Sequence, residues 1–431
     1  MPWPVSYGPV VTPFLPDPEK VRAIRVDLPA TAAGIFMNAG TCGPIPVPAA
    51  QAMADAAARE LTVGRAHRDA YDELLVRMDE TRAAVAAVLG TAVDRVALTG
   101  STTEGLAAAL LSVDWRAGDR VVTTAHEHPG LTATLAMLRD RRGVQIVVVD
   151  VGDGGDHDRT VAAVATAVDT AVARRPRLVA LSHVLWTTGA VLPAARIVEV
   201  AHAASVPVAL DGAQAAGAIP LDIDAIGAEF YAVPGQKWLL GPEGTGALAV
   251  SEAALAWAEP LAAGYFGAAI PYATGRAHLW ADARRFEVAG FHVPSIVGLG
   301  RSVGWLSMYV GLPWAHARAA DLAARMGAKL RRIPGVTVVT PPDAAATLLA
   351  FRVGGWPAEA VLEELGRRIF LVARPIPGFD ALRLSIGWWN TDDELGRVAD
   401  AVGELARHTP DTLPRRPAIA VIDALTELGD R

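Results

Sequence analysis

The chain has 431 residues, of which 52% are hydrophobic and 20% charged, and its formal net charge is -7. This balance is typical of a globular protein, and the length favours two domains over one. The negative charge and the lack of a Lys/Arg block in the sequence argue against nucleic acid or an anionic membrane surface as a partner.

Other segments narrow the class of protein further. No apolar run has the roughly 18 residues needed to cross a bilayer, and the first ten residues lack the pattern of a secretory signal, so we expect a cytoplasmic protein. The single cysteine, Cys42, excludes an internal disulfide. No Cys/His pattern has zinc spacing, so we expect no metal site.

Residues 1–33 are predicted to be an N-terminal arm. Prolines at positions 2, 4, 9, 13, 16 and 18 favour an extended segment, followed by a short helix around Glu19 to Val26. We expect the arm to pack on the smaller domain or on a partner. A short strand, 34–37, then enters a loop that begins with Asn38 and contains Cys42, and its glycines either allow close approach to a ligand or form a tight turn.

A long amphipathic stretch, about 48–90, predicts two helices that meet near residues 63–68. The strand 96–99 follows and leads into a helix that begins near Ser101. Its first turn carries Thr102 and Thr103. Free N–H groups at a helix start, together with two hydroxyls, suit a phosphate. The alternative is that these hydroxyls are ordinary N-caps.

Histidine and tryptophan side chains follow two further predicted strands. The strand 120–124 is followed by His126 and His128, and the strand 177–182 by His183 and Trp186. A flat imidazole at such a strand end can stack on a planar cofactor. Without other evidence, His126 and His128 could equally be solvated loop residues.

The next two strands deliver a carboxylate and an amine. The strand 206–210 ends in Asp211, and the strand 229–233 leads to Lys237. Pyridoxal 5'-phosphate (PLP) needs a lysine amine to form its Schiff base and a carboxylate that keeps its pyridine nitrogen protonated. We therefore predict PLP as the cofactor, although a surface lysine and a helix-capping aspartate would give the same spacing.

All these strand ends lie at one edge if the sheet is parallel and its crossovers are right-handed, and that edge is where open α/β sheets bind ligands. The convergence favours PLP over unrelated local roles. No G-x-G-x-x-G follows a strand, and GPEGTG at 241–246 lacks the Walker lysine pattern, so a dinucleotide is disfavoured.

The pattern changes after residue 251. A long aromatic and glycine-rich segment, 261–295, shows little periodicity, and loops of that length are usually functional. We place the large domain at 34–295 and a smaller α+β domain at 296–431. In the smaller domain, Arg374 lies in a predicted loop and Arg383 begins a predicted strand; either one can clamp a substrate carboxylate or form an interdomain salt bridge.

Together these motifs resemble those of the class V aminotransferase group of fold-type I PLP enzymes. They are T-T-E-G, E-H, S-H-V, D-G-A-Q, G-Q-K, R-F-E and R-L-S-x-x-x-x-N-T. That group includes cysteine desulfurases, C–S lyases and isopenicillin N epimerase-like proteins. The resemblance covers about 34–405 and implies a mainly parallel seven-stranded sheet, an amino-acid substrate and a homodimer whose sites are completed by the partner's loop, here 285–292.

The resemblance also implies roles for individual residues. The expected cofactor-binding and catalytic set is Lys237, Asp211, Gln214 on the phenolic oxygen, His128 stacked on the ring, Thr102 and Thr103 on the phosphate, with Gln236 and Trp186 beside them. The expected substrate-binding set is Arg383, Arg374, Asn38 and Cys42.

Departures from the family pattern indicate which reaction to expect. Desulfurases carry a nucleophilic cysteine in a second-domain loop, and this chain has none between Arg367 and Arg383. Gln236 and Trp186 replace a histidine and an asparagine. We therefore expect a lyase that cleaves the C–S bond of a cysteine-like or S-substituted cysteine by β-elimination. Decarboxylation, oxidative deamination, transamination and epimerisation remain alternative reactions. A cysteine desulfurase ranks below these alternatives, and a non-catalytic PLP-binding module ranks last.

Overall fold

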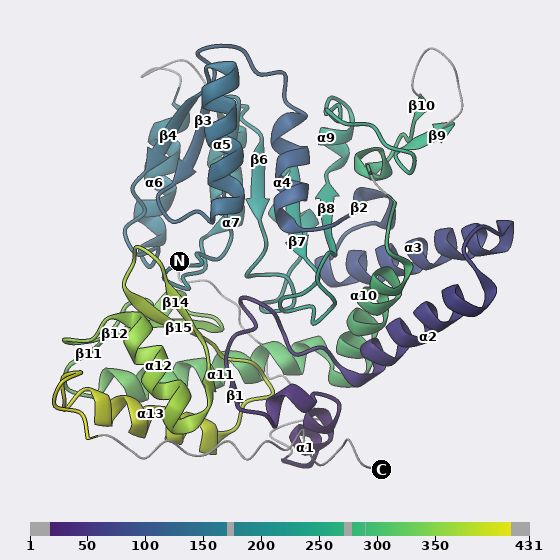
Figure 1. Cartoon of the computed structure of the whole chain (residues 1–431). Helices are drawn as coiled ribbons and strands as arrows, with labels where there is room; N and C mark the ends of the chain where they lie inside the picture. Colours follow the sequence, from purple (N-terminus) through teal and green to yellow (C-terminus); the bar gives the residue numbers. More distant parts are fainter. Residues whose placement is uncertain (1–17, 170–175, 271–277, 289, 415–431) are drawn as a thin grey trace.

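The computed structural model describes residues 18–169, 176–270, 278–288 and 290–414 (Figure 1). Most of the predicted arm, residues 1–17, and the C-terminal segment 415–431 lie outside the described residues. The described chain begins with α1 (Pro18–Val26), as the sequence predicts.

A seven-stranded sheet dominates the first part of the chain and confirms the predicted fold class. Its strands, in spatial order, are β2 (Val96–Thr99), β8 (Gly246–Val250), β7 (Phe230–Pro234), β6 (Val208–Asp211), β5 (Leu178–Ser182), β3 (Arg120–Thr124) and β4 (Gln145–Val149). Among these strands only β8 runs antiparallel to its neighbours. The carboxyl ends of the other six therefore meet at one edge.

Helices cover both faces of this sheet, which explains why its strands read as continuous apolar runs. In β5, Leu178 and Ala180 pack with α4 (Thr102–Leu111) and α5 (Pro129–Arg142). Val179 and Leu181 point the other way and pack with α6 (His157–Val168) and α7 (Ala194–Ala203). Short helices α8 (Ile223–Ile226) and α9 (Glu252–Leu255) flank β7 and β8.

Three long helices pack against one another on the β2 side of the sheet and project away from it (Figure 1). They are α2 (Val47–Val63), α3 (Arg68–Leu89) and α10 (Val293–Trp305). The break between the first two falls where the sequence predicts it. After α10 the chain makes a π-helical turn, η4 (Leu306–Val310), and enters α11 (Leu312–Arg331).

A second, four-stranded antiparallel sheet follows. Its order is β11 (Val336–Val338), β12 (Leu348–Val353), β15 (Ala381–Ser385) and β14 (Arg374–Ile376). One face packs on α11, α12 (Ala358–Ile369) and α13 (Asp392–Leu405) through residues such as Phe351, Leu382 and Leu384. Since side chains alternate along a strand, Arg383 and Ser385 lie on the other face of β15.

The two sheets are joined by more than the connecting helices. The short strand β1 (Ile35–Phe36) pairs with β13 (Leu371–Val372), and Ile35 and Met37 are buried in the core of the second sheet. The loop that starts at Asn38 therefore begins at the second sheet and runs to the edge of the first. The domain bounds 1–33, 34–295 and 296–431 stay a proposal.

Two local expectations need correction. The segment 261–295 is not wholly irregular, because β9 (Ala268–Ile270) and β10 (His278–Leu279) form a small antiparallel pair. Arg374 lies at the start of strand β14 and not in a loop.

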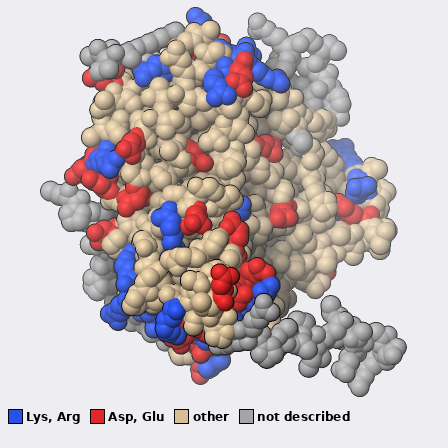
Figure 2. All heavy atoms as spheres, turned by 60° about the vertical axis from the view of Figure 1, so that its left-hand side comes forward, with Lys and Arg blue, Asp and Glu red and all other residues tan. Residues whose placement is uncertain are grey.

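Two surface properties bear on the expected partners. No helix in the described part of the chain is long and apolar enough to cross a membrane. On the face drawn in Figure 2, acidic and basic side chains lie among one another over both halves of the molecule.

Candidate active site

A cavity of about 250 Å³ opens at the carboxyl edge of the seven-stranded sheet. Eleven of the twelve residues predicted for the site line it: Cys42, Thr102, Thr103, His128, Trp186, Asp211, Gln214, Gln236, Lys237, Arg374 and Arg383. Asn38 is the exception. Its side-chain oxygen accepts a hydrogen bond from Thr41, which lines the cavity and in turn accepts one from Arg374.

For both Lys237 and Asp211, burial and the charge of the other residue shift the pKa in opposite directions. Burial lowers the pKa of Lys237 to about 8, against the attraction of Asp211, and Arg383 and Arg374 lower it further. Burial raises the pKa of Asp211, while Lys237 and the backbone N–H of Ala213 lower it. That N–H donates to Oδ1 at 2.8 Å, and Oδ2 makes no hydrogen bond with another described residue. The free carboxylate oxygen is therefore available to a cationic ring nitrogen.

His128 begins α5 at the rim of the cavity. Its Nδ1 accepts a hydrogen bond from the N–H of Gly130 at 3.1 Å, which orients the ring. Trp186 meets the ring edge to face, with centroids 5.3 Å apart. Burial lowers the pKa of His128 to about 4, and Lys237 and the two arginines lower it further. The imidazole is therefore neutral near pH 7, which suits stacking on a planar group.

The start of α4 forms another wall. Ser101 caps the helix by accepting the N–H of Glu104, so the cap is a serine one residue before the predicted pair. Neither Thr102 nor Thr103 uses its hydroxyl in a hydrogen bond to another described residue, although both line the cavity. Two uncommitted hydroxyls at the positive end of a ten-residue helix suit a phosphate.

Arg374 and Arg383 face each other directly across the β14–β15 pair. Arg383 is 1% exposed, and its Nη1 donates to the carbonyl of Trp186, but its Nε and Nη2 have no partner among the described residues. Burial lowers the pKa of Arg383 to about 9, and Arg374 adds to that effect. Like charges opposite each other cost stability, so this pair is suited to receive an anion.

The loop after β1 closes the site and is held at two points. The side-chain N–H of Gln214 donates to the carbonyl of Gly40 at 2.9 Å, and the N–H of Gly43 donates to the carbonyl of Gln236 at 2.7 Å. Gly43 lies so near Lys237 that a Cβ there would meet the lysine carbonyl at 2.3 Å. The glycine thus permits close backbone approach, one of the two roles that the sequence left open for this loop.

Cys42 also faces the cavity, but as a neutral thiol. Its Sγ donates to a carboxylate oxygen of Glu243 at 3.2 Å. Burial raises its pKa to about 11, and the hydrogen bond and charge of Glu243 contribute. Such a thiol is a poor nucleophile near neutral pH.

Two buried polar residues, Glu127 and Tyr231, were not singled out for the site from the sequence. Glu127 is buried and accepts hydrogen bonds from the Thr124 hydroxyl and from both the N–H and the hydroxyl of Ser182, so it ties β3 to β5. Burial raises its pKa to about 7. His183 and Tyr231 form a buried hydrogen bond of 2.8 Å. A glutamate three residues after an apolar strand end was the available signal for the first.

The cavity fits PLP on the chemistry of its free groups. An amine, a carboxylate oxygen, two hydroxyls at a helix start and a guanidinium with unused N–H groups all converge there. No group of three or more His, Cys, Asp or Glu side chains among the described residues can hold a metal ion. The α/β fold and this donor set define a PLP-dependent enzyme.

The chain belongs to the aminotransferase class-V family, whose model matches residues 36–395. This confirms the family that the motifs suggest.

Similar proteins cover nearly the whole chain. A probable cysteine desulfurase from Methanothermobacter thermautotrophicus is 26% identical and aligns over 90% of this chain and 98% of its own length. An isopenicillin N epimerase from Amycolatopsis lactamdurans is 29% identical over 86% and 95% of the two chains.

Two solved structures of the cystine C–S lyase C-DES have the same fold, both with a TM-score of 0.82. One, bound to the reaction product cysteine persulfide, is 26% identical and covers 87% of this chain and 99% of the C-DES chain. The other, a variant with glycine covalently linked to the PLP cofactor, is 25% identical and covers 88% and 98%.

Proposed function

We propose that the protein is a lyase that cleaves the C–S bond of a cysteine-like or S-substituted cysteine by β-elimination, in sulfur or secondary metabolism. The observation that carries this proposal is the state of Cys42. It is the single cysteine of the sequence, and its pKa of about 11 leaves it protonated. Elimination needs no thiolate in the protein, whereas sulfur transfer to the enzyme does.

The residues of the cavity have different roles in the proposed reaction. Arg383, supported by Arg374, holds the substrate carboxylate by charge-assisted hydrogen bonds. The amine of Lys237 takes the proton from the α-carbon, and a pKa of about 8 suits a base that works near neutral pH. Asp211 holds a proton at the ring nitrogen. When bound, PLP supplies the ring that accepts the electrons left at the α-carbon.

The relatives support a substrate of this class. C-DES is named a cystine C–S lyase, and its complex holds cysteine persulfide. The relative from Methanothermobacter is named a probable cysteine desulfurase, which is again cysteine chemistry. An epimerase among the relatives keeps reprotonation of the α-carbon as the second candidate.

The test is a substrate series with three products measured. The purified holoenzyme is incubated with cysteine, cystine and S-alkyl cysteines, and pyruvate, ammonia and sulfide or thiol are assayed. We expect pyruvate and ammonia in equal amounts, with a rate that depends on the sulfur substituent. Loss of the substrate's optical activity in deuterated buffer without pyruvate would replace elimination with epimerisation.

The proposal includes a homodimer in which loop 285–292 of a second copy completes each site. In its own chain this loop is anchored by Glu287, which is buried and accepts hydrogen bonds from Arg82 and from the N–H of Leu98. Sedimentation of the holoenzyme should give twice the mass of one chain. A monomer with full activity would contradict this part of the proposal.

A further inference from the structure

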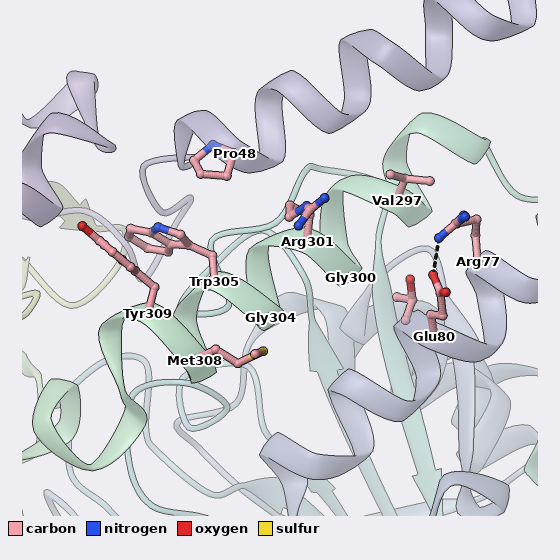
Figure 3. Close-up of a pocket in the computed structure, with 11 residues that line it drawn as sticks. Pro48, Arg77, Glu80, Val297, Gly300, Arg301, Gly304, Trp305, Met308 and Tyr309 are labelled. Carbon is pink, nitrogen blue, oxygen red and sulfur yellow. Dashed lines mark hydrogen bonds and ion pairs between the residues drawn. The ribbon is translucent and has the colours of Figure 1, made fainter.

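The active cavity and a larger cavity of the structure differ in how their carboxylates are paired. The larger one, of about 510 Å³, lies between α2, α3, α10 and η4, and its one carboxylate, Glu80, forms an ion pair with Arg77 (Figure 3). The active cavity is lined by two carboxylates, Asp211 and Glu243. Asp211 has a place beside Lys237, whereas Glu243 forms no ion pair with another described residue and has no contact with the substrate in the roles given above.

Backbone hydrogen bonds hold Glu243 at the mouth of the active cavity. The residue lies in the GPEGTG turn, is exposed, and lines the cavity. At the base of the turn, the N–H of Gly235 donates to the carbonyl of Thr245 at 2.8 Å, and the carbonyl of Gly235 accepts the N–H of Gly241 at 2.8 Å. Because Gly235 comes two residues before Lys237, the same stretch of backbone positions the carboxylate and the amine.

Cys42 connects Glu243 to the groups that hold the substrate. Its Sγ donates to Oε1 of Glu243 at 3.2 Å. The same thiol lies near enough to Lys237 and Arg374 for both positive charges to oppose the rise of its pKa. The carboxylate of Glu243 is therefore separated by one small, uncharged side chain from the amine and the guanidinium that the proposed reaction uses.

The charges of the cavity make Glu243 an attractive position for a cation. Three cations line the cavity, Lys237, Arg374 and Arg383, and they repel a positive group on the substrate. Asp211 serves the ring nitrogen of the cofactor. Oε2 of Glu243 makes no hydrogen bond with another described residue, so it is free to accept one from a ligand. A substituent that reaches the mouth of the cavity is thus attracted there only if it is positively charged.

We propose that Glu243 selects substrates whose sulfur substituent ends in an ammonium group, and that its carboxylate binds this ammonium by a charge-assisted hydrogen bond. The inference rests on the proposed function, because it takes the substrate to be a cysteine derivative held by Arg383 and Lys237. The substituent extends from the sulfur past the neutral thiol of Cys42 to the mouth of the cavity. An uncharged substituent gains nothing from Glu243, and an anionic one is repelled.

The test compares two compounds of nearly the same shape, S-(2-aminoethyl)-L-cysteine and S-propyl-L-cysteine, which differ in the terminal ammonium. For the native holoenzyme and for Glu243→Gln, kcat/KM is measured for each compound from pyruvate release, and the ratio of the two values is taken. A general loss of activity or folding cancels in this ratio. The matched control is Glu359→Gln, which removes another exposed carboxylate, on α12, that makes no hydrogen bond or ion pair with another described residue.

We expect the native ratio to favour the ammonium compound by about fivefold, which corresponds to about 1 kcal/mol for a solvent-exposed ion pair. The ratio should fall to about one in Glu243→Gln, through KM, and should keep its native value in Glu359→Gln. Added salt should reduce the native ratio, because exposed charges are screened. An equal ratio in the native enzyme and Glu243→Gln would overturn the proposal, and so would a native ratio that salt does not change.

A second measurement needs no product and separates this inference from the proposed function. The concentration of each compound that half-saturates the change in visible absorbance of the holoenzyme gives its binding constant. A preference for the ammonium compound that is lost in Glu243→Gln supports the inference even without pyruvate, a result that would refute the elimination alone. Pyruvate from both compounds with equal preference in the two enzymes would overturn the role of Glu243 and keep the elimination. No absorbance change with either compound would overturn both.

Discussion

The active cavity takes its groups from two sheets that place them by different means. In the parallel sheet, topology alone brings the residues after β2, β3, β5, β6 and β7 to one edge. In the antiparallel sheet, Arg374 and Arg383 reach the cavity because β14 and β15 pair in one register and because Arg383 faces away from the helices. Slipping either strand by one residue would turn its arginine into the core.

The two contributions also differ in charge. The parallel edge has a buried carboxylate beside its amine. Burial favours the neutral forms of Asp211 and Lys237, and the attraction between their charges partly opposes this effect. The antiparallel pair has two cations and no carboxylate partner in the described chain. The repulsion between these two cations therefore lowers the stability of the fold on the side that must receive the substrate. Binding sites commonly differ from structural ion pairs in this way.

The largest expected effect is on the parallel edge. Lys237→Ala removes both the amine that anchors the cofactor and the base, so turnover should fall by about 10⁴-fold or more. The visible absorbance of the lysine-bound cofactor should also disappear. Lys329→Ala on the exposed side of α11 is the matched control and should change neither property. Surviving turnover in the first variant would remove Lys237 from the mechanism.

On the antiparallel side, Arg383→Gln should lower kcat/KM by about 10²-fold, because charge-assisted hydrogen bonds contribute about 1.5–3 kcal/mol each. Arg383→Lys keeps the charge but loses the planar fork, so its loss should lie nearer tenfold. The effect should appear mainly in KM. Equal activity of the two variants would show that the geometry of the guanidinium is unimportant, and an unchanged KM would exclude carboxylate binding by Arg383.

A pH-dependent effect is expected where Glu127 ties β3 to β5. Because its pKa is raised from 4.5 to about 7, the folded state binds more protons than the unfolded state between these values. Its contribution to stability therefore falls as pH rises through that window, by about 3 kcal/mol in total. Glu127→Gln has no such proton to lose.

The measurement is the difference in unfolding free energy between Glu127→Gln and the native apoprotein, from urea titrations at several pH values. This difference should increase in favour of the variant from pH 4.5 to 7. Taking the difference cancels the titration of His128 and His183, whose lowered pKa values act in the opposite sense. A flat line for Glu127→Gln would refute the raised pKa.

Arg374→Gln should separate binding from stability. Relief of the repulsion across the β14–β15 pair should raise the unfolding free energy of the unliganded protein by about 0.2–1 kcal/mol. Activity should fall by about tenfold, because one donor to the substrate is lost. Arg332→Gln, at the exposed C-cap of α11 and with no side-chain hydrogen bond or ion pair to another described residue, should do neither. A variant that loses both stability and activity would mean that Arg374 supports the fold through its hydrogen bond to Thr41.

The contrast between the sheets also explains what could be predicted from the sequence. Strand ends such as Asp211 and Lys237 are visible locally, and parallel topology then places them together. The pairing of Arg374 with Arg383 depends on a register that no local pattern encodes, so the sequence put Arg374 in a loop. The buried role of Glu127 was missed for a related reason, since its partner Ser182 lies 55 positions away. At Gly43 the structure shows a close approach to the backbone of Lys237, where the sequence left close approach and a tight turn both open.

The smallest expected effect is the most informative about the reaction. With a pKa of about 11, about one Cys42 thiol in ten thousand is ionised at pH 7. If elimination is the reaction, Cys42→Ala should leave kcat/KM for an S-alkyl cysteine within about threefold, because the residue only lines the wall. If sulfur is instead passed to the protein, the same variant should lose sulfide release from cysteine entirely. Glu243→Gln separates the two reactions further. Burial is the main cause of the raised thiol pKa, and the variant removes the charge of Glu243 that adds to it, so sulfur transfer would become faster while elimination from a cysteine with an uncharged S-alkyl group would not change.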